Sequence, residues 1–401
     1  MKIILNIEYS CIHGTYWMFY GVVCSFASVF LLDRGYSNSD IGIILAVANV
    51  LAVFMQPILA DLADRSKRIS LIGVTEVITI ILAVLMAATF ILNRASIALS
   101  VVFVMMVAWI TALQPLFNSL CFKLSECGHE VSFGIPRSMG SLFYAVLVAF
   151  LGTLVEKHGI IVLQLSGEMI LAALLFTLWL TSRHFNKAGG SKVAEAKGET
   201  LEEEINLIDF VKRNRLFVIA NIAIAGIFFS NAIFNNYMLQ IVESVGGDSE
   251  DMGHIFSVMA FLEIPPMFLF DKIRKHFRIQ TLLKFSAVCF AVKTAWVFFS
   301  GSVGMLIVAQ FFQLTAFGVF IPAIVIFIDE IMDRGEAVKG QALYTIVVTV
   351  STVFASLAGG FILDIAGPKI MVLVALVITG LGTVVFAGII DKIKNKKIIT
   401  S

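Results

Sequence analysis

Among the charged residues inside long apolar stretches of this 401-residue chain, Arg137, Glu263 and Lys293 are the candidates for chemistry. The planar guanidinium of an arginine grips a carboxylate or two adjacent hydroxyls, and a buried carboxylate binds and releases a proton. Burying an arginine in a bilayer costs at least about 2.5–3.5 kcal/mol, so such a residue is a candidate for function. The structural alternatives are a snorkelling side chain for Arg137 and a static ion pair for Glu263 with Lys293.

Amide and imidazole side chains interrupt other apolar stretches. Gln310 and Gln313 share one helical face, and Asn235 lies in a segment that holds three asparagines. Such amides bind a polar ligand or hydrogen-bond between helices, and both alternatives stay open. His13 titrates near neutral pH and is a candidate for proton coupling, with a solvated histidine near the membrane surface as the alternative. Its segment carries further polar and aromatic side chains, at Glu8, Tyr16, Trp17 and Tyr20.

The composition places these residues in a membrane protein. Hydrophobic residues make up 59% of the chain, charged residues 14%, and the mean hydropathy is +0.94. A soluble domain averages roughly 45–50% apolar and about 25% charged residues. The net charge of +1 argues against a nucleic-acid partner, and the five cysteines show neither zinc spacing nor a disulfide framework. The chain also lacks the common motifs of hydrolases and nucleotide binding, so we expect neither an enzyme nor a cofactor.

Apolar stretches of the length that a bilayer requires occur twelve times. A hydrocarbon core about 30 Å thick needs about 20 mostly apolar residues in a helix. The stretches lie near 10–32, 41–62, 69–92, 96–120, 136–155, 159–181, 214–241, 253–271, 279–300, 303–328, 341–364 and 369–390. They predict an all-α membrane protein of two six-helix bundles, at 1–181 and 214–391. The polar segment 182–213 reads as a solvated cytosolic linker, and 392–401 as a cytosolic basic tail.

The distribution of lysine and arginine predicts the orientation in the membrane. If the N-terminus is cytosolic, the cytosolic segments hold 22 of these residues. The external loops then hold four, Arg34, Arg94, Lys157 and Lys369. The positive-inside rule therefore places both termini in the cytosol and favours an even number of helices. The first apolar stretch lacks a signal-peptide cleavage site, so we expect a retained helix in the inner cell membrane.

Two motifs in the first half resemble the major facilitator superfamily. The segment 37–65, SNSDIGIILAVANVLAVFMQPILADLADR, resembles the oligosaccharide:proton symporters typified by lactose permease. It ends on a Gly-x-x-x-Asp-Arg loop signature in which Ala60 replaces the glycine and Asp64 and Arg65 follow. The second motif, FGIPRSMG at 133–140, resembles the opening of helix 5 in that family. Nucleoside permeases share much of the same pattern, and after residue 250 the resemblance is looser.

The resemblance implies roles for several residues of the first half. Arg137 occupies the position of the sugar-binding arginine, and Tyr144 that of a tryptophan that stacks on the sugar ring. Asn118 stands where the family keeps a helix-4 glutamate. Since an amide cannot neutralise Arg137, the substrate is anionic or another acid supplies the counter-charge. Asp64 and Arg65 correspond to cytosolic gate residues.

In the second half the resemblance implies a changed proton-coupling cluster. Lys293 falls at an arginine of that cluster, whereas Gln310, Gln313 and Asn235 replace groups that titrate in the family. Glu263 lies about one turn from the family's helix-8 glutamate, and Pro265 and Pro266, which follow it, predict a local opening of the helix. By elimination, Glu263 with Lys293 is the predicted coupling site.

These observations predict a secondary active transporter that works by alternating access. The expected cargo is a small polar solute, sugar-like or nucleoside-like, with a proton as co-substrate, and the carrier is expected to be a monomer in the lipid bilayer. The missing titratable groups leave a uniporter or an exporter as the alternative within transport. A non-transporting membrane sensor is the alternative from another class, although no soluble output domain is evident.

Overall fold

The computed structural model of the chain describes residues 2–65, 71–125, 134–187, 210, 213–332 and 334–393. Within these ranges the structure is helical and contains no strand. Helices satisfy their own peptide hydrogen bonds, which is a requirement for a segment that lies in lipid. The chain divides into two compact units, Met1–Leu201 and Glu202–Ser401.

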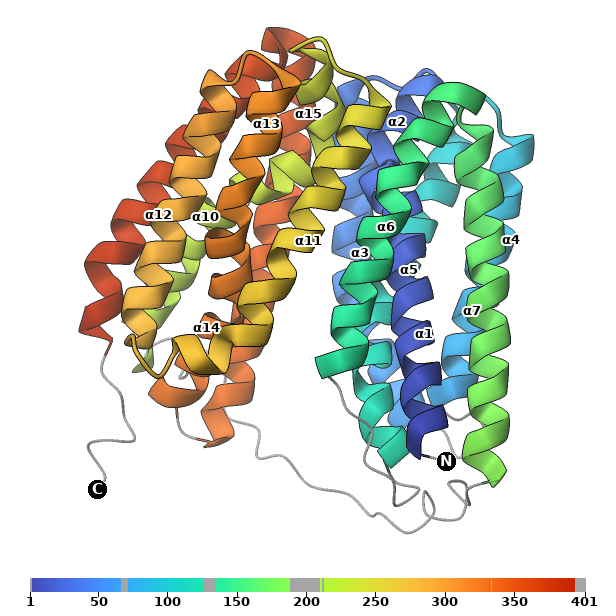
Figure 1. The fold of residues 1–401 in the computed structure, drawn as a ribbon, viewed down its shortest axis with the longest axis horizontal. Helices are drawn as coiled ribbons and strands as arrows, with labels where there is room; N and C mark the ends of the chain where they lie inside the picture. The colour runs from blue at the N-terminus through green and yellow to red at the C-terminus, as the bar shows by residue number, and fades with distance from the viewer. Residues whose placement is uncertain are drawn as a thin grey trace. The chain divides into compact units, whose positions relative to one another are not determined.

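The first unit opens with a bent helix. α1 (Lys2–Tyr20) passes into the π-helical turn η1 (Gly21–Ser25) and then into α2 (Ala27–Asp33), with a bend of 44°. The other helices of the unit are α3 (Asn38–Arg65), α4 (Leu71–Ile91), α5 (Ile97–Ser125), α6 (Gly134–His158) and α7 (Ile161–Lys187). α1 packs against α6 and α7, and α5 packs against α3 and α4 (Figure 1).

The second unit contains two interrupted helices. Its elements are α10 (Arg215–Glu243), α11 (Ser249–Ile273), α12 (Ile279–Phe299), α13 (Val303–Ala309), η3 (Gln310–Phe312), α14 (Gln313–Ile331), α15 (Arg334–Ile389) and η4 (Ile390–Lys392). The 3₁₀ turn η3 joins α13 to α14 within one span, and α10 is kinked at Tyr237. α10 packs against α15, while α14 packs against α11 and α12.

The predicted all-α architecture with twelve crossings is confirmed. Ten helices of the described chain are long and apolar enough to span a membrane, and the bent pair at the N-terminus makes an eleventh span. One of the ten, Lys339–Lys392, is 54 residues long and holds the last two predicted crossings. Gly367 separates these two crossings, because its backbone is not helical. Its φ of 79° is a left-handed conformation that glycine adopts without strain.

The outer surface of each unit is apolar, as a lipid-facing surface requires. Large side chains such as Phe54, Phe150, Met169 and Val384 expose between 66% and 73% of their surface. Such side chains occur on helices of both units, as is expected where lipid and not water covers the surface.

In the second unit α10 and α15 approach each other closely at a pair of glycines, Gly226 and Gly382. A Cβ atom added at Gly382 would lie 2.7 Å from the Ala223 carbonyl oxygen and 3.0 Å from the Ile227 nitrogen, which are backbone atoms that cannot turn aside. Gly382→Ala is therefore expected to destabilise the protein by about 1–3 kcal/mol, measured as thermal unfolding in detergent. Gly380→Ala is the matched control, since no described heavy atom lies within 4 Å of its added Cβ. Equal melting temperatures for the two variants would contradict the importance of this contact.

The predicted linker and tail are described only in part. α7 continues to Lys187, six residues beyond the predicted end of the first bundle. Residues 188–209, 211–212 and 394–401 lie outside the described ranges. The boundaries predicted at 181, 214 and 391 therefore stay predictions.

Candidate functional site

Arg137 lies one turn into α6 and stacks on an aromatic ring of α1. Its guanidinium carbon is 4.4 Å from the centroid of the Trp17 ring, and its Nη1 donates to the Ser141 hydroxyl at 3.3 Å. Gly140 permits this approach, because a Cβ there would lie 2.4 Å from Cδ1 of Trp17. Stacking engages the face of a guanidinium and leaves its edge oriented for planar hydrogen bonding. The half-buried Arg137 and Trp17 thus form a platform for a polar ring.

Trp17 extends this platform into an aromatic cluster. Its ring centroid lies 5.2 Å from that of Tyr20 and 5.4 Å from that of Tyr16. The indole Nε1 is buried and has no hydrogen-bond partner within the described part of the chain. Trp17 had no predicted role, although its spacing with His13 and Tyr20 places these side chains on one helical face.

Asn118 and Tyr144 differ in what the structure offers a ligand. The side-chain oxygen of Asn118 is buried and accepts no hydrogen bond from any described residue, so it suits a donor on a solute. Tyr144 instead bonds to the π-helical turn, with its hydroxyl 2.8 Å from the Ser25 hydroxyl. Its ring packs against Gly21, where an added Cβ would lie 3.2 Å from two ring carbons. Tyr144 therefore braces the bend that follows α1.

His13 is buried within the first unit and is 1% exposed. Its Nε2 lies 2.9 Å from the hydroxyl of Tyr9, which donates to the Phe117 carbonyl at 3.0 Å. The alternative of a solvated surface histidine was therefore wrong. The position of His13 in a polar chain between α1 and α5 is compatible with proton transfer, which stays a prediction.

The second unit contains a polar chain that joins three helices. Lys293 of α12 donates to the side-chain oxygen of Gln313 at 2.6 Å, and the Gln313 amide nitrogen donates to Oε1 of Glu263 at 2.7 Å. Lys293 and Gln313 are each 1% exposed, whereas Glu263 on α11 is half-buried. Lys293 also lies 5.6 Å from the Phe234 ring centroid. The predicted pairing of Glu263 with Lys293 is thus relayed through Gln313.

The two remaining predicted amides lie in different surroundings. Gln310 is fully buried in η3, where its Nε2 donates to the Leu306 carbonyl at 2.8 Å. Asn235 is exposed on α10. The next asparagine, Asn236, donates to the Ser356 hydroxyl of α15 at 2.8 Å, which is the interhelical bond that the sequence left as an alternative.

Comparison with known proteins decides the family. A family model described as "MFS_1 like family" matches residues 9–374, which is most of the chain. The chain belongs to the MFS_1-like family. It is therefore a membrane transporter of the major facilitator superfamily, as the sequence motifs predicted.

The relatives and structural neighbours of this MFS_1-like transporter are distant. It is 24% identical over 367 residues to the uncharacterized transporter YwbF of Bacillus subtilis (strain 168), with 89% of this chain and 87% of that protein covered. It is also 24% identical over 371 residues to a probable 3-phenylpropionic acid transporter of Escherichia coli (strain K12), with 90% and 92% covered.

Two solved structures share the fold of the MFS_1-like chain. The crystal structure of the nucleoside transporter NupG matches with a TM-score of 0.79 at 16% identity and covers 98% of this chain and 100% of that one. That of the POT family transporter PepTSo matches with a TM-score of 0.72 at 10% identity, with 98% and 97% covered.

Two expectations for the MFS_1-like chain need correction. Pro265 and Pro266 do not break α11, which runs as one helix from Ser249 to Ile273. The elimination that selected Glu263 also overlooked two buried carboxylates, because Glu8 is 7% exposed and Oε1 of Glu168 is buried. Periodicity alone did not reveal these two burials. The predicted gate residues Asp64 and Arg65 end α3, but their side chains lie outside the described residues.

Proposed function

We propose that this transporter is a secondary active carrier that moves a small, ring-bearing polar solute by alternating access with proton symport. The observation that carries the proposal is the half-buried guanidinium of Arg137 stacked on Trp17. An aromatic face accommodates a sugar or nucleobase ring, and a guanidinium edge accommodates its hydroxyls or a carboxylate. The carrier acts as a monomer in the inner membrane with both termini in the cytosol, in line with the uneven distribution of lysine and arginine.

A second candidate substrate class is an aromatic carboxylate. Asn118 stands where related symporters keep a glutamate, so a cargo with its own negative charge suits Arg137. The relative from Escherichia coli carries the name of a probable 3-phenylpropionic acid transporter. A nucleoside or sugar offers a ring without that charge.

The proposal of proton symport is supported by the chain from Lys293 through Gln313 to Glu263. In this chain a buried cation and a carboxylate lie on different helices and share one neutral amide. A change in helix packing alters the separation of the two charges and with it the affinity of Glu263 for a proton.

Counterflow in proteoliposomes tests the function. Proteoliposomes that contain the purified protein are loaded with unlabelled uridine, lactose or 3-phenylpropionate. Uptake of the same compound in labelled form is then followed without a proton gradient. We expect counterflow with one of these probes and none in protein-free vesicles. Counterflow with 3-phenylpropionate alone would select the aromatic carboxylate. Absence of counterflow with all three probes would contradict the proposed substrate classes and favour the non-transporting sensor.

A further inference from the structure

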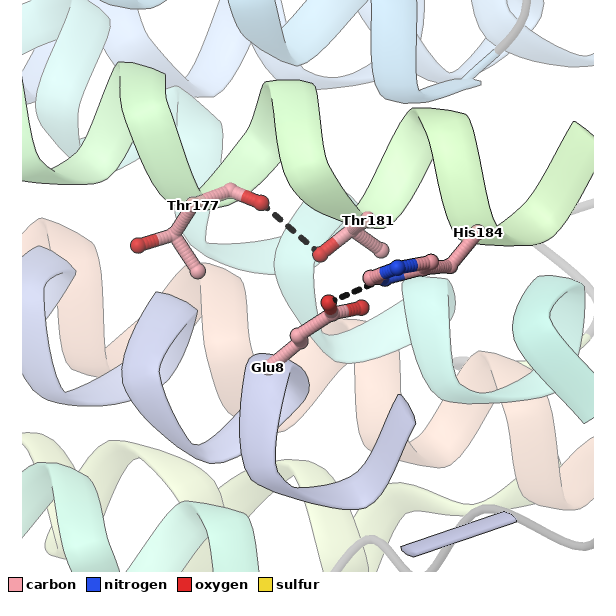
Figure 2. A network of polar contacts seen from close by, with 4 residues as sticks. All are labelled: Glu8, Thr177, Thr181 and His184. Carbon is pink, nitrogen blue, oxygen red and sulfur yellow. Dashed lines mark hydrogen bonds and ion pairs between the residues drawn. The ribbon is translucent and has the colours of Figure 1, made fainter. Parts of the chain in front are cut away.

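Glu8 and His184 join the first and last helices of the first unit. Oε1 of Glu8 on α1 lies 2.5 Å from Nδ1 of His184 on α7, although the two residues are 176 positions apart. Figure 2 shows the carboxylate and the imidazole facing each other across the contact between these helices. Neither residue belongs to the Arg137 platform or to the chain at Glu263.

The two partners differ in their access to water. The side chain of Glu8 is 9% exposed and that of His184 is 29% exposed. Oε2 of Glu8 is buried and accepts no hydrogen bond from the described residues. The nearby hydroxyl of Thr181 donates instead to the Thr177 carbonyl at 2.9 Å (Figure 2). A carboxylate in these surroundings depends on His184 for its compensation.

The protonation of His184 determines how complete that compensation is. Because a carboxylate is an acceptor, Nδ1 of His184 carries the hydrogen of this contact. A further proton binds at Nε2 and converts a hydrogen bond from a neutral imidazole to the carboxylate into an ion pair. Among the common side chains, an imidazole is the one that most readily gains or loses a proton near neutral pH. His184 lies three residues before the end of α7, on the side that the loop charges predict to be cytosolic.

Other ionisable groups lie on the two helices that carry the pair and on the helices that pack against them. Among the described residues they include Tyr9, Cys11 and His13 on α1, Lys123 on α5, Glu76 on α4, Arg137, Glu156, Lys157 and His158 on α6, and Glu168, Arg183 and Lys187 on α7. Cys11 on α1 interacts electrostatically with Glu8. Arginine and lysine ordinarily keep their charge across the range in which histidine titrates, so they act as a constant background.

We infer that Glu8 and His184 form a proton-binding latch between α1 and α7. Proton uptake at Nε2 of His184 fastens the two helices through an ion pair, and proton loss leaves the buried Glu8 carboxylate without a full counter-charge. α1 also carries Trp17, so the latch regulates the platform at Arg137. The regulatory part of this inference rests on the proposed transport function, whereas the latch itself does not.

A double-mutant cycle at several pH values tests the latch without transport. Glu8→Gln, His184→Gln and the double variant are compared with the wild type by thermal unfolding in detergent. At about pH 5.5 each single variant is expected to lower the melting temperature by about 2–4 °C, and the double variant by no more than either. At about pH 8.5, above the range in which an imidazole ordinarily binds a proton, this coupling should largely disappear.

Matched variants complete the test. His276→Gln removes an exposed histidine between α11 and α12 and should leave the pH dependence unchanged. If the single variants do not fold, the exchange variant with Glu8→His and His184→Glu should restore the fold and the pH dependence. Coupling that is constant across this pH range would overturn the latch in favour of a static hydrogen bond. Absence of coupling, or an exchange variant that does not fold, would overturn the pairing.

Transport measurements then test the regulation. The pH is varied between about 5.5 and 8.5 on the side of the vesicle membrane that His184 faces. We expect the rate of wild-type counterflow to change about fivefold over this range, and we expect His184→Gln to abolish the change. Wild-type counterflow that is independent of this pH would overturn the regulatory role. If the wild type shows no counterflow, the proposed function fails, while the unfolding cycle still decides whether the latch exists.

Discussion

Arg137→Lys is expected to weaken solute binding by about thirtyfold or more. Lysine keeps the positive charge but has neither the planar fork nor the flat face that stacks on Trp17. Truncating one partner of a buried charged hydrogen bond costs about 2–5 kcal/mol, and 2 kcal/mol corresponds to about thirtyfold in affinity. The loss should appear as a raised dissociation constant for the solute that shows counterflow, measured with purified protein.

A second arginine of the same unit supplies the control for this prediction. The guanidinium carbon of Arg183 lies 4.6 Å from the Trp179 ring centroid, so it has the same stacking chemistry on α7. Arg183→Lys should leave solute affinity unchanged, because it alters a similar pair outside the platform. If folded Arg137→Gln also bound with wild-type affinity, Arg137 would be a snorkelling side chain and its assignment to the solute would be wrong.

The fold was predictable from sequence because lipid imposes a simple rule. Any chain of twelve apolar stretches of about 20 residues must form helices, whatever the packing between them. The π-helical turn at Gly21–Ser25 was not predictable in the same way. It occurs where the Tyr144 ring packs on Gly21 and its hydroxyl meets Ser25, and these are contacts between α6 and η1 rather than properties of the segment.

The candidate sites were predictable as a set of residues but not as pairs. Apolar surroundings singled out Arg137, Glu263 and Lys293, because polar groups in such stretches are costly. Pairing depends on the rotation of each helix, where one residue corresponds to about 100°. The sequence therefore proposed a direct contact between Glu263 and Lys293, whereas the structure places Gln313 in the chain. The contact between Glu8 and His184, which are 176 positions apart in the chain, could not be predicted for the same reason.

Protonation of Glu263 would change the net charge of the polar chain in the second unit. With Glu263 ionised and Lys293 charged, the chain is neutral, and the Gln313 amide presents its oxygen to the cation and its nitrogen to the carboxylate. Protonation of Glu263 leaves a net positive charge at Lys293, which is 1% exposed. That charge is unfavourable unless the helices rearrange. A carrier that binds its proton here therefore links protonation to helix movement.

Glu263→Gln is expected to separate solute movement from proton movement. The variant keeps the size and hydrogen-bonding capacity of the side chain but cannot titrate. Counterflow should persist, while substrate-induced alkalinisation outside the vesicles should fall to the level of protein-free controls. Glu168→Gln is the matched control, since Glu168 is also a membrane-helix glutamate but lies on α7 of the other unit, and it should retain both activities.

If Glu263→Gln still moved protons, coupling would belong elsewhere, with His13 and Glu8 as the next candidates. If the wild type itself moved none, the carrier would be a uniporter or would use another ion. In that case the chain from Lys293 to Glu263 would be the static interhelical link that the sequence left as the alternative.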